Sequence, residues 1–243
     1  MSTWLILGGS SAMARALARA VAAEGDAVFP AGRDKGDLEA LATDCRLRGA
    51  SEAEAIRFDA RDASGFAAIH ERMVKSHGPL NIAVFTGSMP PQDEIDADPS
   101  LITGVIQDSF TGPAELITLL APHVEATQGT VVGVGSVAGD RGRIGNYVYG
   151  SAKAGFHTYM SGLRNRLTRS GAHAITVKPG FVDTAMTWGL EGMFLVASPD
   201  AVARDILNAV KKRKDVIYTP FFWRYIMLII RNIPERIFKK LSV

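Results

Sequence analysis

The chain has 243 residues, 47% of them hydrophobic, so it can bury a substantial core and intrinsic disorder is excluded. Its 27 basic and 25 acidic residues nearly balance, which argues against a broad nucleic-acid-binding face. The single cysteine, Cys45, excludes an internal disulfide and favours the reducing cytoplasm. Residues 4–7 are too short for a secretory signal, and no run approaches the roughly 18 apolar residues of a membrane-spanning helix.

Short apolar runs alternate along the chain with longer stretches of helical spacing. The predicted strands are residues 4–7, 27–30, 55–58, 82–85, 130–134 and 174–177. The predicted helices are residues 12–24, 37–48, 64–77, 100–123 and 149–170. Most strand runs lack polar alternation, as expected for strands buried on both faces. The pattern predicts an α/β fold, a single doubly wound Rossmann-type parallel sheet with helices on both faces. Ligands then bind beyond the carboxyl ends of the strands.

A turn of small residues joins the first predicted strand to the first helix. It consists of Gly8, Gly9, Ser10, Ser11, Ala12, Met13 and Ala14. Such a turn lets the backbone approach a pyrophosphate, whose charge lies at the helix N-terminus. Ala12 and Ala14 stand where a dinucleotide-binding loop usually has glycine. A plain tight turn with Ser10 or Ser11 as N-cap is therefore an equal alternative.

The ends of the second and third strands indicate which dinucleotide would bind. Arg33, with no acidic residue immediately before it, suits the 2′-phosphate of NADP through bidentate charge-assisted hydrogen bonds. NADP(H) is therefore favoured, with NAD(H) as the alternative. The competing interpretation is a solvated Arg33 that pairs with Asp34 or Asp37. Asp59, at the end of the third strand, either binds the adenine or caps the following helix.

Tyr149 and Lys153 stand four residues apart on a predicted helix, and Ser136 follows the fifth strand. Residues at this spacing share one helix face. A phenol with a pKa near 10 is a poor acid–base catalyst at pH 7, but a neighbouring ammonium favours the phenolate and lowers that pKa. Ser136 can donate a hydrogen bond to a substrate carbonyl while Tyr149 delivers a proton opposite a hydride donor.

Together these residues resemble the short-chain dehydrogenase/reductase family. The residues that carry the resemblance are the Gly8 turn, Ser136, Tyr149, Lys153, Pro179, Gly180 and Thr184. The resemblance implies a carbonyl reductase or alcohol dehydrogenase in which Ser136 positions the carbonyl and Tyr149 is the general acid/base. Lys153 would bind the ribose and lower the tyrosine pKa. It also implies that Pro179, Gly180 and Thr184 face the cofactor beside the nicotinamide.

Two departures from the family pattern leave other functions open. Phe85, Thr86 and Gly87 replace the family's Asn-Asn-Ala-Gly stretch, with Gly87 still expected at the cofactor. Ser109 replaces the catalytic asparagine that holds a water for proton relay. A non-catalytic dinucleotide-binding sensor or interaction module is therefore the alternative, and an epimerase or dehydratase is a weaker one. The five histidines show no metal-ligand spacing, so no metal site is predicted.

Within a catalytic domain of residues 1–220, residues 181–197 correspond to the family's mobile lid over the substrate. Its apolar residues are Met186, Trp188, Met193, Phe194 and Leu195. They predict an apolar or adaptable substrate surface, with packing on the core as an equal alternative.

Residues 221–243 form an apolar and basic tail. Residues 221–230 are apolar and aromatic apart from Arg224, and the cations after them are Arg231, Arg236, Lys239 and Lys240. The run is too short to span a bilayer but suits peripheral contact with the inner face of a membrane. Burial against a second subunit or over the pocket is the alternative.

The tail and the Ala12/Ala14 turn are similar to a bacterial subgroup that includes reductases of lipid-linked keto-sugars, such as decaprenylphosphoryl 2-keto-pentose reductases. This implies a small carbonyl or alcohol substrate that is apolar or lipid-linked. Family precedent implies a homodimer or homotetramer, with the helices at 100–123 and 149–170 as interfaces.

Overall fold

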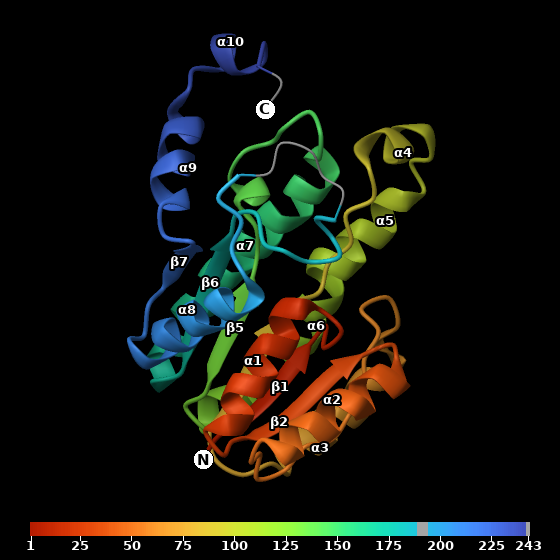
Figure 1. The fold of residues 1–243 in the computed structure, drawn as a ribbon, viewed down its shortest axis with the longest axis vertical. Helices are drawn as coiled ribbons and strands as arrows, with labels where there is room; N and C mark the ends of the chain where they lie inside the picture. Colours follow the sequence, from red (N-terminus) through yellow and green to blue (C-terminus); the bar gives the residue numbers. More distant parts are fainter. Residues whose placement is uncertain (189–193, 242–243) are drawn as a thin grey trace.

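A seven-stranded parallel sheet forms the centre of the computed structural model, which describes residues 1–188 and 194–241 (Figure 1). The strands are β1 (Thr3–Leu7), β2 (Ala27–Gly32), β3 (Ile56–Arg57), β4 (Leu80–Val84), β5 (Thr130–Val134), β6 (His173–Pro179) and β7 (Val216–Thr219). Their order is β3-β2-β1-β4-β5-β6-β7, and every neighbouring pair is parallel. The predicted doubly wound α/β fold is confirmed.

Helices cover both faces of this sheet. The long helices are α1 (Ala12–Ala23), α2 (Lys35–Leu47), α3 (Phe66–Val74), α6 (Gly112–Ala126), α7 (Tyr147–Leu167) and α8 (Pro199–Lys211). Helices α1, α2 and α8 share one core cluster and α3, α6 and α7 another. Alternate residues of β1 divide between the clusters, Trp4 and Ile6 toward the first and Leu5 and Leu7 toward the second. This alternation explains why the buried strands are apolar along their whole length.

Helix α8 and strand β7 were not among the predicted elements, and neither were the short helix at residues 92–97 and the tail helices. Helix α8 begins at Pro199, and the Ser198 side chain caps it by accepting from the N–H of Ala201. Strand β7 extends the sheet beyond β6 and is buried only in part, because it lies at the edge.

The predicted helix at 100–123 is interrupted. It divides into α5 (Leu101–Ile106), a π-helical turn (Gln107–Thr111) and α6, while the shorter α4 (Gln92–Ala97) precedes it. Gly112 is pressed against the backbone of Ala60, whose carbonyl oxygen would lie 2.0 Å from an added Cβ. A π-helical turn often marks a functional site, and this one carries Ser109.

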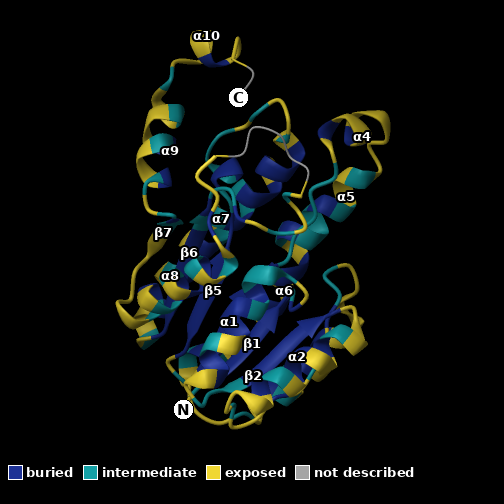
Figure 2. Ribbon diagram, viewed as in Figure 1, coloured by how far each residue is buried: buried dark blue, intermediate teal, exposed yellow. Residues whose placement is uncertain are grey.

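The tail forms α9 (Trp223–Asn232) and α10 (Glu235–Phe238), which extend along one edge at the top of Figure 1. Trp223 and Met227 are buried against Val137, whereas the outer face of α9 is exposed (Figure 2). Within residues 1–188 and 194–241, no helix is long and apolar enough to cross a membrane. The tail is therefore packed onto the domain along one side and uncovered along the other.

Candidate active site

A cavity of about 450 Å³ opens at the carboxyl ends of β1, β2 and β4. The strand order reverses between β1 and β4, which is where open parallel sheets bind ligands. Most of the predicted cofactor-binding residues line this cavity: Gly8, Ser10, Ser11, Ala12, Met13, Arg33, Asp59, Gly87 and Thr184. The remaining three, Lys153, Pro179 and Gly180, do not line it.

The turn after β1 leaves room for a pyrophosphate. Gly8 has φ +82°, and an added Cβ would lie 3.0 Å from the Phe85 carbonyl carbon, so both conformation and space require glycine. Ser11 is the N-cap residue of α1 but makes no side-chain capping bond, and no acidic residue lies in the first turn. The positive end of α1 therefore faces the cavity without a competing carboxylate in that turn. Ala14 is fully buried in the core beneath α1, where its methyl group is accommodated.

Arg33 lies exposed at the rim of this cavity. The two carboxylates expected to compete for it are engaged elsewhere. Asp34 caps α2 by accepting from the N–H of Asp37, and the Asp37 carboxylate pairs with Arg15. Among the described residues Arg33 makes no ion pair, so the interpretation of Arg33 as a partner of Asp34 or Asp37 is wrong. Arg15 also lines the cavity, and sequence reasoning missed it.

Asp59 does not cap the next helix. Its Oδ1 accepts from the backbone N–H of Arg61 at 3.0 Å, and Asp62 caps the following 3₁₀ turn instead. The Arg61 side chain forms a two-bond pair with Asp108, at 2.9 and 2.7 Å. Asp108 is a second cavity residue that sequence reasoning missed, because only the fold brings it opposite Arg61.

Tyr149 and Lys153 are buried behind the inner wall of the cavity, 7% and 3% exposed. Helix α7 is held at its start by Gln92, whose side-chain oxygen accepts from the N–H of Val148 at 3.2 Å. The Lys153 ammonium donates to the carbonyl oxygens of Thr86 (3.0 Å) and Val134 (3.2 Å), which joins α7 to the ends of β4 and β5.

The titration of this pair differs from the sequence-based expectation. Burial raises the pKa of Tyr149 to about 12, and a hydrogen bond with Ser136 only partly opposes it. Burial also lowers the pKa of Lys153 to about 8. The Lys153 ammonium lies 5.8 Å from the centre of the tyrosine ring, too far to offset the loss of solvation. In this structure the Tyr149 pKa is therefore raised rather than lowered, and the tyrosine is protonated at pH 7.

Gly87 forms the narrow wall between the cavity and the buried pair. An added Cβ would lie 3.2 Å from both the Lys153 ammonium and the Ser109 hydroxyl. Ser109 is 1% exposed, and its hydroxyl makes no hydrogen bond to any described residue. The fold thus brings the Ser109 hydroxyl and the Lys153 ammonium to the same side of this glycine. An unpaired buried hydroxyl there fits a polar group or water entering from the cavity.

The lid is described in part. Met186 lines the cavity and Trp188 is 87% exposed, whereas Met193 lies outside the described residues. Phe194 packs on Trp223 of α9 at 5.4 Å between ring centres.

Known proteins share this arrangement. The family model described as short chain dehydrogenase matches residues 2–193. The chain belongs to the short-chain dehydrogenase/reductase family. It is therefore an NAD(P)-dependent oxidoreductase, as the resemblance implied.

Relatives cover almost the whole of this short-chain dehydrogenase/reductase. An uncharacterized oxidoreductase of Mycobacterium tuberculosis is 32% identical over 239 residues, 98% of this chain and 96% of that protein. The ketoacyl reductase HetN of Nostoc is 27% identical over 219 residues, 87% and 76% of the two chains. A short-chain dehydrogenase from Sphingobium yanoikuyae, solved in complex with NADPH, superposes with a TM-score of 0.76 at 23% identity and 96% coverage of both chains. None of these names tests the resemblance to lipid-linked keto-sugar reductases, so that substrate class stays a prediction.

Proposed function

We propose that this protein is an NADP(H)-dependent carbonyl reductase, or secondary-alcohol dehydrogenase in reverse, with Tyr149 as its general acid/base. The observation that carries the proposal is the position of Gly87. Gly87 lines the cavity, and an added Cβ there would lie 3.2 Å from the buried Lys153 ammonium, so the cavity and the lysine are neighbours.

Each residue of the set has a distinct task in the reduction. A nicotinamide dinucleotide, held by the residues that line the cavity, would supply the hydride for the reduction. Ser136 accepts the N–H of Ala138 at 3.1 Å, which leaves its hydroxyl proton to bond the carbonyl oxygen. Tyr149, protonated because burial raises its pKa to about 12, gives that oxygen its proton and the product is a secondary alcohol. Lys153 supplies positive charge toward the phenolate that forms, and Ser109 holds the proton-relay water.

The preference for NADP(H) follows from charge at the cavity rim. Arg33 is exposed there, and Arg15 of α1, which pairs with Asp37, lines the same cavity. Two guanidinium groups favour a 2′-phosphate over a free ribose hydroxyl.

The first experiment measures nucleotide binding by fluorescence and then NADPH consumption with a panel of ketones that includes keto-sugars. Tight NADPH binding is expected for the wild type. In Tyr149→Phe the turnover rate should fall at least a hundredfold while the NADPH Kd is unchanged, because general acid catalysis contributes a factor of about 10²–10⁴ to the rate. Arg33→Ala should weaken NADPH by about tenfold or more and leave NADH unaffected. Binding without any turnover would favour the non-catalytic sensor, and binding of neither nucleotide would contradict the proposal.

The tail is proposed to hold the enzyme at the inner face of a membrane. Phe221, Tyr225, Leu228 and Ile229 are 60–73% exposed. The last three share one face of α9 by their spacing, and Phe221 lies in the turn just before that helix. Residues 221–241 hold five Arg or Lys residues and one Glu, a net charge of +4. The whole chain carries only +2, so the excess positive charge is concentrated beside the apolar face. Apolar residues with flanking cations suit an anionic bilayer surface.

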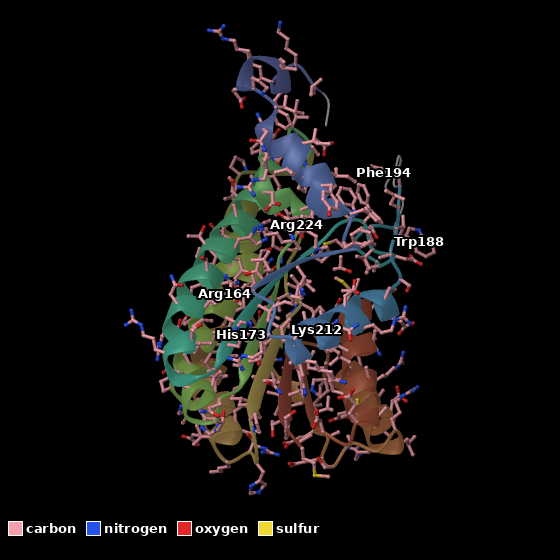
Figure 3. The ribbon with its side chains drawn as sticks, turned by 90° about the vertical axis from the view of Figure 1, so that its left-hand side faces the viewer. Arg164, His173, Trp188, Phe194, Lys212 and Arg224 are labelled. Atoms are coloured by element: carbon pink, nitrogen blue, oxygen red, sulfur yellow. The ribbon has the colours of Figure 1, made fainter. Side chains whose placement is uncertain are left out.

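The same surface supports an apolar or lipid-linked substrate. Trp188 and Phe194 of the lid lie at the same end of the molecule as Arg224 of α9 (Figure 3). A substrate that is anchored in a membrane would therefore meet the lid first. The proposed location is the cytoplasm, where the thiol of Cys45 stays reduced. Burial raises the pKa of this thiol to about 11, so it is protonated and unreactive at pH 7.

The proposed assembly is a homodimer or homotetramer through α6 and α7. A hollow between these helices is lined by Phe110, Gly155, Tyr159 and neighbours, and Leu119 is 41% exposed on α6. Small and apolar residues on two adjacent helices suit close helix packing between subunits.

A further inference from the structure

A buried polar group that the proposed mechanism does not use lies beside Ser136. The carboxylate of Asp140 is 2% exposed and accepts from the Lys178 ammonium at 2.5 Å and from the Tyr218 hydroxyl at 2.7 Å. The Nδ1 atom of His157 lies 3.7 Å from the same carboxylate. These side chains come from the turn after β5 (Val137–Asp140), α7, β6 and β7. Four elements far apart in the sequence therefore converge next to one serine.

His157 contacts the serine segment directly. The N–H of Ser136 donates to His157 Nε2 at 3.3 Å. The glycines on either side make room for the ring, since an added Cβ would lie 2.1 Å from Nε2 at Gly135 and 2.7 Å from Cε1 at Gly139. The imidazole thus fills a notch that two glycines leave open around Ser136.

The surroundings of the ring determine where its proton lies. Nε2 can accept from Ser136 only if the proton is on Nδ1, the atom that faces Asp140. Burial, and next the charge of Lys178, lower the pKa of His157 to about 3, so the ring is neutral at physiological pH. A neutral ring with a fixed tautomer is a permanent acceptor for the Ser136 N–H.

We propose that His157 is a positioning residue for Ser136, held by the Asp140–Lys178–Tyr218 group. The inference rests on the proposed function, because positioning matters only if Ser136 bonds a substrate carbonyl. The ring keeps the Ser136 backbone extended, with φ −167° and ψ 153°. The serine hydroxyl, which already accepts from Ala138, then directs its proton toward Tyr149 and the substrate.

Paired variants of His157 test this role. His157→Leu removes the acceptor, and His157→Gln keeps an amide acceptor near the position of Nε2. We expect kcat to fall about tenfold in the leucine variant, as for one lost hydrogen bond in the transition state, and to recover in the glutamine variant. The NADPH Kd should be unchanged in both. His173→Leu is the control, because the His173 side chain is 7% exposed against 10% for His157 but bonds the Lys214 carbonyl at the amino end of β6 (Figure 3).

Tyr218→Phe is a milder variant should His157→Leu not fold, and a two- to threefold fall in kcat is expected because it removes one donor to Asp140. Wild-type kcat in both the His157→Leu and Tyr218→Phe enzymes, or a loss no larger than in His173→Leu, would overturn the inference. Nitrogen-15 NMR of the imidazoles gives a test without substrate. A neutral Nδ1–H tautomer of His157 that persists to pH 5 is expected, and an Nε2–H tautomer would overturn it. A wild-type enzyme without turnover would instead contradict the proposed function, and the NMR result would still decide this inference.

Discussion

At the scale of single residues, burial works against ionisation of both Tyr149 and Lys153. The folded pKa of Lys153, about 8, lies below the ordinary 10.5 because the ammonium exchanges water for two carbonyl oxygens. The unfolded chain therefore binds one more proton than the folded protein between pH 8 and 10.5. Stability contributed by this residue rises with pH in that window, and the full penalty is present below pH 8.

Lys153→Met removes this titration. As pH rises from 8 to 10.5, the free energy of unfolding of the wild type should increase by about 3 kcal/mol relative to the variant, since each pKa unit corresponds to about 1.4 kcal/mol. Urea denaturation at several pH values measures the difference. Parallel stability profiles for the two proteins would show that Lys153 has an ordinary pKa. The same variant should lose turnover, because no other described ammonium donates to the ends of β4 and β5.

At the scale of elements, the tail helix packs on the segment that follows β6. Trp223 of α9 is 2% exposed and packs on Gly180, where an added Cβ would lie 1.9 Å from its Nε1. Its ring also meets Phe181 at 5.6 Å and Phe194 at 5.4 Å. The predicted division after residue 220 therefore falls between two segments that share a core. Only glycine at position 180 permits this contact.

A double-mutant cycle measures that contact. Trp223→Ala should destabilise the fold by about 3–5 kcal/mol through the cavity it leaves, and Gly180→Ala by about 1–3 kcal/mol through overpacking. Together the two changes should destabilise less than their sum, because the added methyl enters space that the indole has vacated. Strictly additive values from urea denaturation would mean that the two residues are not in contact.

At the scale of the whole molecule, charge and apolar surface are distributed unevenly. The sheet and its helices bury most of their large apolar residues, whereas α9, α10 and the described part of the lid expose several of theirs, among them Leu228, Ile237 and Trp188 (Figure 2). Arg141 anchors this end by donating to the carbonyls of Ile230 and Ile233, both at 2.6 Å. The exposed face is thus presented on a fixed helix rather than a loose end.

Vesicles that contain anionic lipid test this face. Leu228→Gln combined with Ile229→Gln should reduce binding at least tenfold, because about 0.8 kcal/mol is lost per CH₂ withdrawn from the bilayer. Added salt should weaken binding of the wild type, since the flanking cations are screened. The matched control is Leu47→Gln combined with Val74→Gln, which are exposed on α2 and α3. If the α9 variant, or a chain cut after Pro220, bound the vesicles as tightly as the wild type, membrane contact would be contradicted. If these changes instead converted a dimer to a monomer, the exposed face would be assigned to contact with a second copy of the chain.

Local patterns in the sequence were sufficient for much of the fold. Apolar runs without polar alternation indicated six of the strands, because a parallel strand that is buried on both faces carries no polar side. Strand β7 has a partly exposed edge pattern and was missed. Helix α8 was missed as well, although its Ser198 N-cap, Pro199 and the apolar spacing of Val202, Ile206 and Ala209 are local helix signals. The relation of Tyr149 to Lys153 was predictable as well, because helical spacing is a local property.

The amino-acid sequence by itself determined six strands of the sheet and the family, both of which depend on short-range spacing. Tertiary structure alone decided that Arg15 takes Asp37 and leaves Arg33 free of its two neighbouring carboxylates. It also joined His157 to Asp140, Lys178 and Tyr218, and reversed the expected direction of the Tyr149 pKa shift. The physical reason is that burial and pairing depend on which distant segments the fold brings together, and no local pattern encodes the solvent that a side chain loses.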